Sequence, residues 1–200
     1  YDIQVPVMVH YDGFYLSYLS EGVDMPFQED VDQFLSVLKT QPERTVLRPG
    51  QKLGCGSHGI LEGYLELRKK HVEALERAKN KFDKIDKEFE EIFGRSYGGQ
   101  IEEYRMEDAD FVLVGSGSMC GTIKSVIDEK RDAGIKIGFL KIRTYRPFPG
   151  EVMVKSLKGK KAIGVVDRSI CFGFDGGPIY RELKSFETKL EDAKLLSFID

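Results

Sequence analysis

A glycine-rich turn after an apolar run is the sequence's first candidate for ligand chemistry. The run from Phe111 to Thr122 reads FVLVGSGSMCGT, which is typical of a buried strand, a tight turn and the start of a helix. Backbone N–H groups at a helix N-terminus attract anions, so this turn is a candidate phosphate site. The candidate binding residues are Gly115, Ser116, Gly117, Ser118 and Gly121.

Two interpretations of this turn stay open. The dinucleotide fingerprint G-x-G-x-x-G needs a third glycine where Cys120 stands, and no acidic residue follows about 20 positions later to hold a ribose. Lys141 and Arg143 occupy that neighbourhood, and an arginine there suits the 2′-phosphate of NADP. The pattern favours a structural turn, because such turns need glycine and Ser116 or Ser118 can cap the helix without a ligand.

Charged residues follow two further strand-like runs. They are Arg143 and Arg146 after one run, and Asp167 and Arg168 after the next. Ligands of open α/β sheets gather at the carboxyl ends of strands, and an arginine there can bind a carboxylate or phosphate with two hydrogen bonds. The sequence shows no catalytic group beside them, so we favour contacts across an interface over a substrate site.

Neither a metal site nor a catalytic nucleophile is predicted. The three cysteines are widely separated without a C-x-x-C pair, which excludes a cysteine-ligated cluster on this chain. Cys55 and His58 have C-x-x-H spacing, but a zinc site needs about four ligands and no second pair exists. The three histidines are scattered, and no Ser/His/Asp or Cys/His grouping stands out.

The elements that would position these residues form a repeated strand-then-helix pattern. Predicted strands are 111–115, 136–142, 161–166 and 194–199, and predicted helices are 119–133, 150–158 and 178–190. Each strand candidate is a short apolar run, as in strands buried on both faces. The fold class is therefore α/β, with a small, mostly parallel sheet that carries helices on both faces.

A long charged helix is predicted from about residue 61 to residue 93, ahead of the sheet. Its apolar residues fall at alternating spacings of three and four, so they line one face, and Gly94 is a natural stop. Before it, VPVMVHY reads as a strand and the Asp12-Gly13 pair as a turn. We expect residues 1–50 to be the end of a domain whose body lies upstream.

Composition excludes several partners. The chain is 41% hydrophobic and 32% charged with a formal net charge of -3, which gives no basic field for nucleic acid. No apolar run approaches the roughly 20 residues of a membrane span, and no signal peptide is visible at the N-terminus. We therefore expect a cytoplasmic protein without a nucleic-acid or membrane partner.

The whole chain resembles one enzyme family. Its segments VPVMVHYDGFYLSY, GSGSMCGTIKSVIDEKRDAGIKIGFLKIRTYRPFP and KAIGVVDRSICFGFDGGPIYREL are similar to the alpha subunit of the 2-oxoacid:ferredoxin oxidoreductases, the pyruvate synthase family. The run G-x-x-x-x-R-x-x-R-P-F-P from Gly138 to Pro149 is the most specific part.

The resemblance implies an organisation into three parts. Residues 1–50 would be the C-terminal end of a thiamine-diphosphate pyrimidine-binding domain, 51–105 a connecting segment with the long helix, and 106–200 a domain like the C-terminal domain of transketolase. The family's substrate-facing segment and activating glutamate would lie upstream. This fragment would then be inactive alone and would act mainly as scaffold and subunit interface.

The resemblance also implies the chemistry of the intact enzyme. It would decarboxylate a 2-oxoacid on thiamine diphosphate with Mg²⁺, pass electrons through [4Fe–4S] clusters to ferredoxin, and transfer the acyl group to coenzyme A. Its partners would be beta, gamma and delta type subunits, and no cofactor is expected on this fragment. Two alternatives remain, an NADP-binding Rossmann-like oxidoreductase domain and a non-catalytic assembly module. The residues do not select the 2-oxoacid.

Overall fold

We describe a computed structural model of the chain, which covers residues 3–36, 49–50 and 63–200. The chain divides into two compact units. The first comprises Tyr1–Met8 and Gly22–Ser96, and the second comprises Val9–Glu21 and Tyr97–Asp200. The short segment Val9–Glu21 therefore belongs with the α/β unit and not with its neighbours along the chain.

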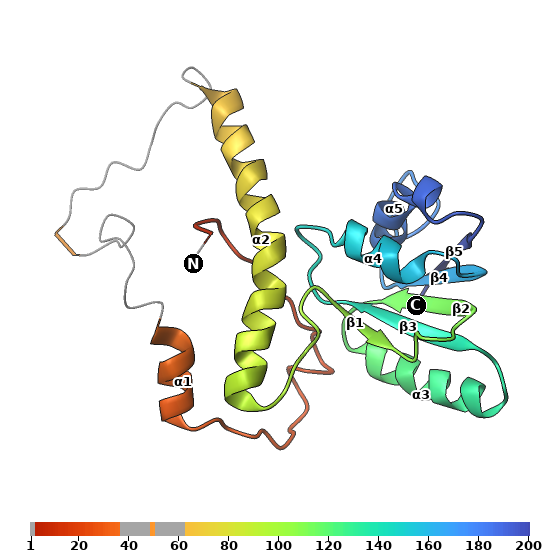
Figure 1. The fold of residues 1–200 in the computed structure, drawn as a ribbon, viewed down its shortest axis with the longest axis horizontal. Coiled ribbons are helices and arrows are strands. Elements are labelled where there is room, and N and C mark those ends of the chain that lie inside the picture. Colours follow the sequence, from red (N-terminus) through yellow and green to blue (C-terminus); the bar gives the residue numbers. More distant parts are fainter. Residues whose placement is uncertain (1–2, 37–48, 51–62) are drawn as a thin grey trace. The chain divides into compact units, whose positions relative to one another are not determined.

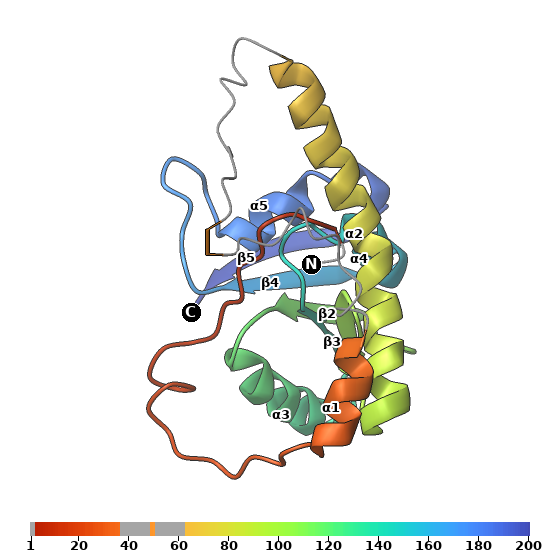
Figure 2. The ribbon, with the colours of Figure 1, turned by 90° about the vertical axis from the view of Figure 1, so that its left-hand side faces the viewer.

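The first unit is built on two helices, α1 (Gln28–Phe34) and α2 (Tyr64–Phe93), which lie side by side in Figures 1 and 2. Phe34 of α1 packs edge-on against the rings of Phe89 and Phe93 at centroid distances of 5.5 and 5.7 Å. Gly94 ends α2 in the left-handed conformation with φ 69°, as the sequence predicts.

The helix α2 has 30 residues and is about 45 Å long. The small residues Ala74 and Ala78 are buried, whereas Ile85 of the predicted apolar stripe stays 44% exposed. Ion pairs on its surface join Lys79 to Glu76 at 2.8 Å and Lys84 to Glu88 at 3.7 Å. Among the described helices, none is both long and apolar enough to cross a membrane.

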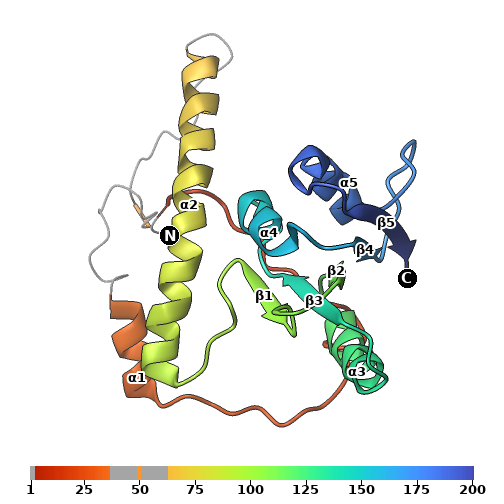
Figure 3. The ribbon, with the colours of Figure 1, turned by 45° about the vertical axis from the view of Figure 1, so that its right-hand side comes forward.

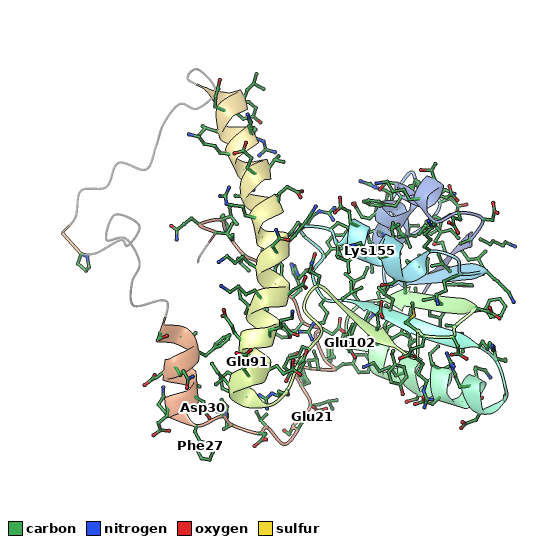
Figure 4. The ribbon with its side chains drawn as sticks, viewed as in Figure 1. Glu21, Phe27, Asp30, Glu91, Glu102 and Lys155 are labelled. Atoms are coloured by element: carbon green, nitrogen blue, oxygen red, sulfur yellow. The ribbon has the colours of Figure 1, made fainter. Side chains whose placement is uncertain are left out.

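The strand predicted at VPVMVHY is wrong. Residues 5–11 form no regular structure, and Val7, Met8 and Val9 are 73–85% exposed. An apolar, β-branched run becomes a strand only where a neighbouring strand pairs with it, and no described strand does so here. The residue Phe27, just before α1, is also exposed, as the side chains in Figure 4 show.

The second unit is a five-stranded sheet in the order β1-β3-β2-β4-β5. The strands are β1 (Ile101–Tyr104), β2 (Phe111–Gly115), β3 (Ile137–Ile142), β4 (Ala162–Asp167) and β5 (Lys194–Ile199). The last four are parallel and confirm the four predicted strands to within one residue at each end. The edge strand β1, which is antiparallel to β3, was not predicted.

Helices cover both faces of the sheet, as predicted. Figure 3 shows α3 (Met119–Asp132) on one side and α4 (Gly150–Leu157) with α5 (Pro178–Lys184) on the other. Two separate clusters of buried side chains lie under them, one beneath α3 and a larger one beneath α4 and α5. The helix predicted at 178–190 is shorter than expected, because α5 ends at Lys184 and a 3₁₀ turn, Glu187–Lys189, follows.

This strand order places a topological switch point between β2 and β4. From β2 the chain runs through α3 to β3 on one side, and from β3 it returns through α4, over the other face, to β4 beyond β2. Where neighbouring connections leave in opposite directions, a crevice opens at the carboxyl ends of the two strands, and ligands of such folds bind there. The candidate residues at the ends of β2 and β4 lie on either side of this switch point.

Candidate functional site

The loop after β2 requires glycine at two positions, Gly115 for lack of space and Gly117 for its backbone conformation. Gly115 is buried, and a Cβ on it would lie 3.2 Å from the end of Met119. Gly117 has φ +78°, which side chains other than glycine rarely adopt. Gly121 differs, because a Cβ there would meet nothing within 4 Å and its backbone is helical.

The N–H groups of this loop are already used inside the chain. Ser118 donates its backbone N–H to Oδ2 of Asp12 at 2.6 Å. Cys120 and Gly121 donate theirs to the carbonyl oxygens of Gly117 and Ser118 at 3.4 and 3.2 Å. In this structure the Ser118 N–H at the start of α3, which the dinucleotide interpretation would direct at a phosphate, therefore binds a carboxylate of the same chain.

Arg168 holds the same carboxylate from the other side of the switch point. Its guanidinium lies 2.9 Å from Oδ1 of Asp12, 3.8 Å from the carboxylate of Asp200, and 6.0 Å from the ring centre of Tyr15. Hydrogen bonds from Ser118, together with the charge of Arg168, lower the pKa of Asp12 below its ordinary 3.8. The carboxylate is thus ionised and doubly bound at neutral pH.

Asp167 caps the helix α5. Its side chain is 1% exposed and accepts hydrogen bonds from the N–H groups of Ile179 at 2.9 Å and Tyr180 at 3.0 Å. Burial raises the pKa of Asp167 above 3.8, although these two bonds act in the opposite direction. A Cβ on Gly177 would lie 2.2 Å from the Asp167 side chain, so the turn before α5 needs glycine.

The two arginines after β3 point to different partners. Arg143 donates to the carbonyl oxygen of Tyr97 at 2.6 Å and lies 5.0 Å from that ring. Arg146 pairs with Glu182 of α5 at 2.6 Å and stacks over Tyr145 at 4.3 Å. Within the part of the chain that the structure describes, neither arginine hydrogen-bonds or pairs with the Gly117 loop, so the four charged candidates do not form one site.

The described residues offer no metal centre. The pair Cys55 and His58 lies outside them, and within residues 3–36, 49–50 and 63–200 no group of three or more His, Cys, Asp or Glu could hold a metal ion. Cys120 and Cys171 are free thiols. Burial raises the pKa of the Cys120 thiol to about 11, which makes it a poor nucleophile at neutral pH.

A separate pocket lies on the first unit. It has a volume of about 370 Å³ and is lined by residues 3–6 and by Lys70, His71, Ala74 and Arg77 of α2. It holds basic groups but no acidic or nucleophilic partner for them among its lining residues. This lining supports no catalytic chemistry.

Asp12 is the residue that reasoning from sequence missed. Its partner Ser118 lies 106 positions away, so no spacing pattern connects the two. Ser118, one of the two expected positions, is the N-cap residue of α3, but its side chain makes no capping hydrogen bond to the helix, and its N–H binds Asp12.

Comparison with known proteins identifies the second unit. Residues 109–200 match the family model described as pyruvate:ferredoxin oxidoreductase core domain II. The chain is 39% identical over 198 residues to the pyruvate synthase subunit PorA of Methanothermobacter thermautotrophicus, and 41% identical over 199 residues to that of Methanocaldococcus jannaschii. Each match covers 99% of this chain and 50% of the relative.

A third relative carries a different name. It is the NADH-dependent phenylglyoxylate dehydrogenase subunit alpha of Aromatoleum evansii, 36% identical over 191 residues, with 91% of this chain and 45% of the relative covered. A solved 2-oxoglutarate:ferredoxin oxidoreductase from Magnetococcus marinus matches at 13% identity and a TM-score of 0.44, over 75% of this chain and 22% of that one.

The chain spans about half the length of the curated relatives it matches. Its similarity to them extends over both units, while the family model covers the parallel sheet. Residues 109–200 thus match the model of the pyruvate:ferredoxin oxidoreductase core domain II, and nearly the whole chain is similar to one half of the pyruvate synthase subunits PorA.

Proposed function

We propose that this chain is part of a 2-oxoacid:ferredoxin oxidoreductase of the pyruvate synthase type, in which its α/β unit serves as scaffold and subunit contact. The activity is inferred from the relatives, which are pyruvate synthase subunits and which this chain matches over half of their length. The scaffold role is inferred from the site. We propose the same three parts as the resemblance implies: the end of a thiamine-diphosphate pyrimidine-binding domain in residues 1–50, a connecting segment in 51–105, and a domain like the C-terminal domain of transketolase in 106–200.

One observation carries the scaffold role: the polar groups at the switch point are engaged within the chain. The Ser118 N–H and the Arg168 guanidinium bind Asp12, and the Asp167 carboxylate caps α5. A ligand site usually directs a small number of precisely placed polar groups at its ligand. Here the same positions stabilise turns and helix ends instead.

The described residues do not fit the cofactors of the family. A [4Fe–4S] cluster takes four cysteine thiolates, whereas this chain has three cysteines, and burial keeps the pKa of Cys120 near 11. The Mg²⁺ that accompanies thiamine diphosphate takes one or two carboxylates together with phosphate oxygens, and we propose that it is held with the diphosphate outside this chain. We assign these cofactors to other segments and subunits.

The substrate class is a 2-oxoacid. The named relatives include pyruvate synthase subunits and a phenylglyoxylate dehydrogenase subunit, and pyruvate and phenylglyoxylate share only the 2-oxoacid group. The matched region therefore fits an enzyme whose reaction centre for the 2-oxoacid group lies in another segment or subunit, while the substrate side chain varies between relatives. Coenzyme A, ferredoxin and subunits of the beta, gamma and delta types are the proposed partners. We propose the cytoplasm as the compartment, where free thiols such as Cys120 and Cys171 are kept reduced.

The test is purification of the complex through a tag on this subunit in the native organism. The complex is then assayed for coenzyme A-dependent reduction of ferredoxin by a panel of 2-oxoacids that includes pyruvate and phenylglyoxylate. We expect reduction with at least one 2-oxoacid and none without coenzyme A. The proposal would be contradicted if the complex copurified intact with its cofactors and none of the 2-oxoacids supported the reduction of ferredoxin.

A further inference from the structure

The segment Val9–Glu21 joins the α/β unit almost without burying side chains. Its large apolar residues Tyr11, Phe14, Tyr15, Leu16, Tyr18 and Leu19 are 52–77% exposed. The Asp12 side chain is the exception, at 23% exposed. Hydrophobic burial therefore contributes little to holding this segment, which contacts the α/β unit through the polar bonds of Asp12 and the packing of Tyr15 against Arg168.

The place that receives Asp12 has the parts of an anion site. The carboxylate lies at the N-terminus of the 14-residue helix α3, where the N-cap residue Ser118 donates its backbone N–H to it at 2.6 Å. Gly117 lets the carboxylate approach, because a Cβ on it would lie 3.0 Å from Oδ2. Arg168 supplies a full positive charge from the loop after β4, 2.9 Å from Oδ1. Anions gain from both the helix dipole and the arginine.

The segment is folded on itself around this anchor. Phe14 donates its N–H to the Ser17 hydroxyl at 3.0 Å, and the rings of Phe14 and Tyr18 stack at 4.8 Å. Tyr18 also donates its N–H to the carbonyl oxygen of Phe14 at 3.1 Å. A compact turn of this kind can move as one piece when its anchor is released.

We propose that Asp12 is an internal ligand of the switch point, whose carboxylate takes the place of an anionic ligand and clasps the segment Val9–Glu21 onto the α/β unit. The clasp joins the loop after β2 to the loop after β4 through a single side chain. It thereby holds the exposed aromatic turn in one position. This inference is independent of the reaction that the whole enzyme performs.

The first test measures release of the clasped segment in the complete chain. Asp12→Ala removes the carboxylate, and Glu21→Gln removes a negative charge from the exposed end of the same segment as the matched control. We expect chymotrypsin to cleave within residues 14–19 about tenfold faster in Asp12→Ala, since a charge-assisted hydrogen bond contributes about 1.5 kcal/mol or more. Amide hydrogen exchange in residues 118–121 should also accelerate, and Glu21→Gln should change neither measurement.

The second variant, Asp12→Asn, preserves the shape and one acceptor but loses the charge. It serves also if Asp12→Ala does not fold, and we expect its cleavage rate to lie between those of the wild type and Asp12→Ala. The clasp is overturned if both Asp12 variants are cleaved at the rate of Glu21→Gln.

The last test asks whether the emptied place binds an anion. Inorganic phosphate should raise the thermal midpoint of Asp12→Ala more than that of the wild type. It should also slow the cleavage of Asp12→Ala, provided that the helix end and Arg168 of this variant are still folded. The additional change Arg168→Ala should abolish this difference. Equal phosphate effects on the wild type, Asp12→Ala and the double variant would overturn the internal-ligand assignment.

Discussion

Two aspartates near the carboxyl ends of the central strands have their pKa values shifted in opposite directions. Hydrogen bonds from Ser118 and the charge of Arg168 lower the pKa of Asp12, whereas burial raises the pKa of Asp167. Both start from an ordinary value of 3.8, so the difference reports their surroundings alone. The partly buried Asp12 and the fully buried helix cap Asp167 are therefore distinguishable by titration.

We expect carbon-detected NMR titration to give a pKa below 3.8 for Asp12 and a pKa above 3.8 for Asp167. A lowered folded-state pKa stabilises the fold above 3.8, and this contribution is lost as the pH falls through the folded value. The advantage of the wild type over Asp12→Asn in urea unfolding should thus disappear in acid. A raised pKa acts oppositely, so the contribution of Asp167 declines as the pH rises through its folded value. Titration of Asp167 at or below 3.8 would contradict this assignment.

The cysteines should differ in reactivity. Cys120 is 2% exposed and its thiol pKa is raised to about 11 by burial, whereas Cys171 is partly exposed. Alkylation with iodoacetamide at mildly alkaline pH, followed by peptide mapping, should modify Cys171 and spare Cys120 until the chain is unfolded. Modification of native Cys120 at the rate of Cys171 would show that the cluster beneath α3 is not closed.

At the scale of elements, the loop after β2 should depend on Gly117 and not on Gly121. Gly117→Ala forces a side chain into φ +78° and toward Asp12, at a cost of about 1–2 kcal/mol in unfolding free energy. Gly121→Ala meets nothing within 4 Å on a helical backbone and should stabilise α3 by about 0.5–1 kcal/mol. Denaturant unfolding of both variants checks the pair, and equal losses would refute the argument.

The strands that sequence predicts well are rich in apolar residues. β2, β3 and β4 are short apolar runs in the interior of the sheet, and the edge strand β5 has a similar apolar pattern although its residues are only partly buried or exposed. β1 escapes prediction because its four residues, IEEY, contain two glutamates. Glu102, labelled in Figure 4, pairs there with Lys124 and Lys141, so its charges are satisfied only by the folded neighbours.

The site was predictable only where it is local. The turn at Gly117 and the strand-end residues Asp167 and Arg168 follow from the alternation of strands and helices, and the structure brings both loops to the switch point. The partners were not predictable. Asp12 reaches the loop across 106 positions, and Arg146 reaches Glu182 across 36. Such contacts depend on tertiary packing, which no local pattern encodes.

At the scale of the whole molecule, Arg146 tests the scaffold role. Its pair with Glu182 is partly exposed, with side-chain exposures of 53% and 23%, so its loss should cost no more than about 1 kcal/mol of stability. We expect Arg146→Ala in the full complex to weaken subunit assembly, measured by analytical ultracentrifugation. Glu182→Gln, which keeps the arginine, is the control and should weaken it less. An intact complex with a raised KM for coenzyme A would instead make Arg146 a ligand residue.

The central claim is that the α/β unit is a scaffold whose switch point is occupied by its own Asp12. Calorimetric titration of the chain with NADPH, with thiamine diphosphate plus Mg²⁺, and with coenzyme A tests it most directly. We expect no saturable heat from any of the three. A saturable isotherm with NADPH that Gly117→Ala abolishes while Gly121→Ala preserves it would contradict the account and restore the loop as a dinucleotide site.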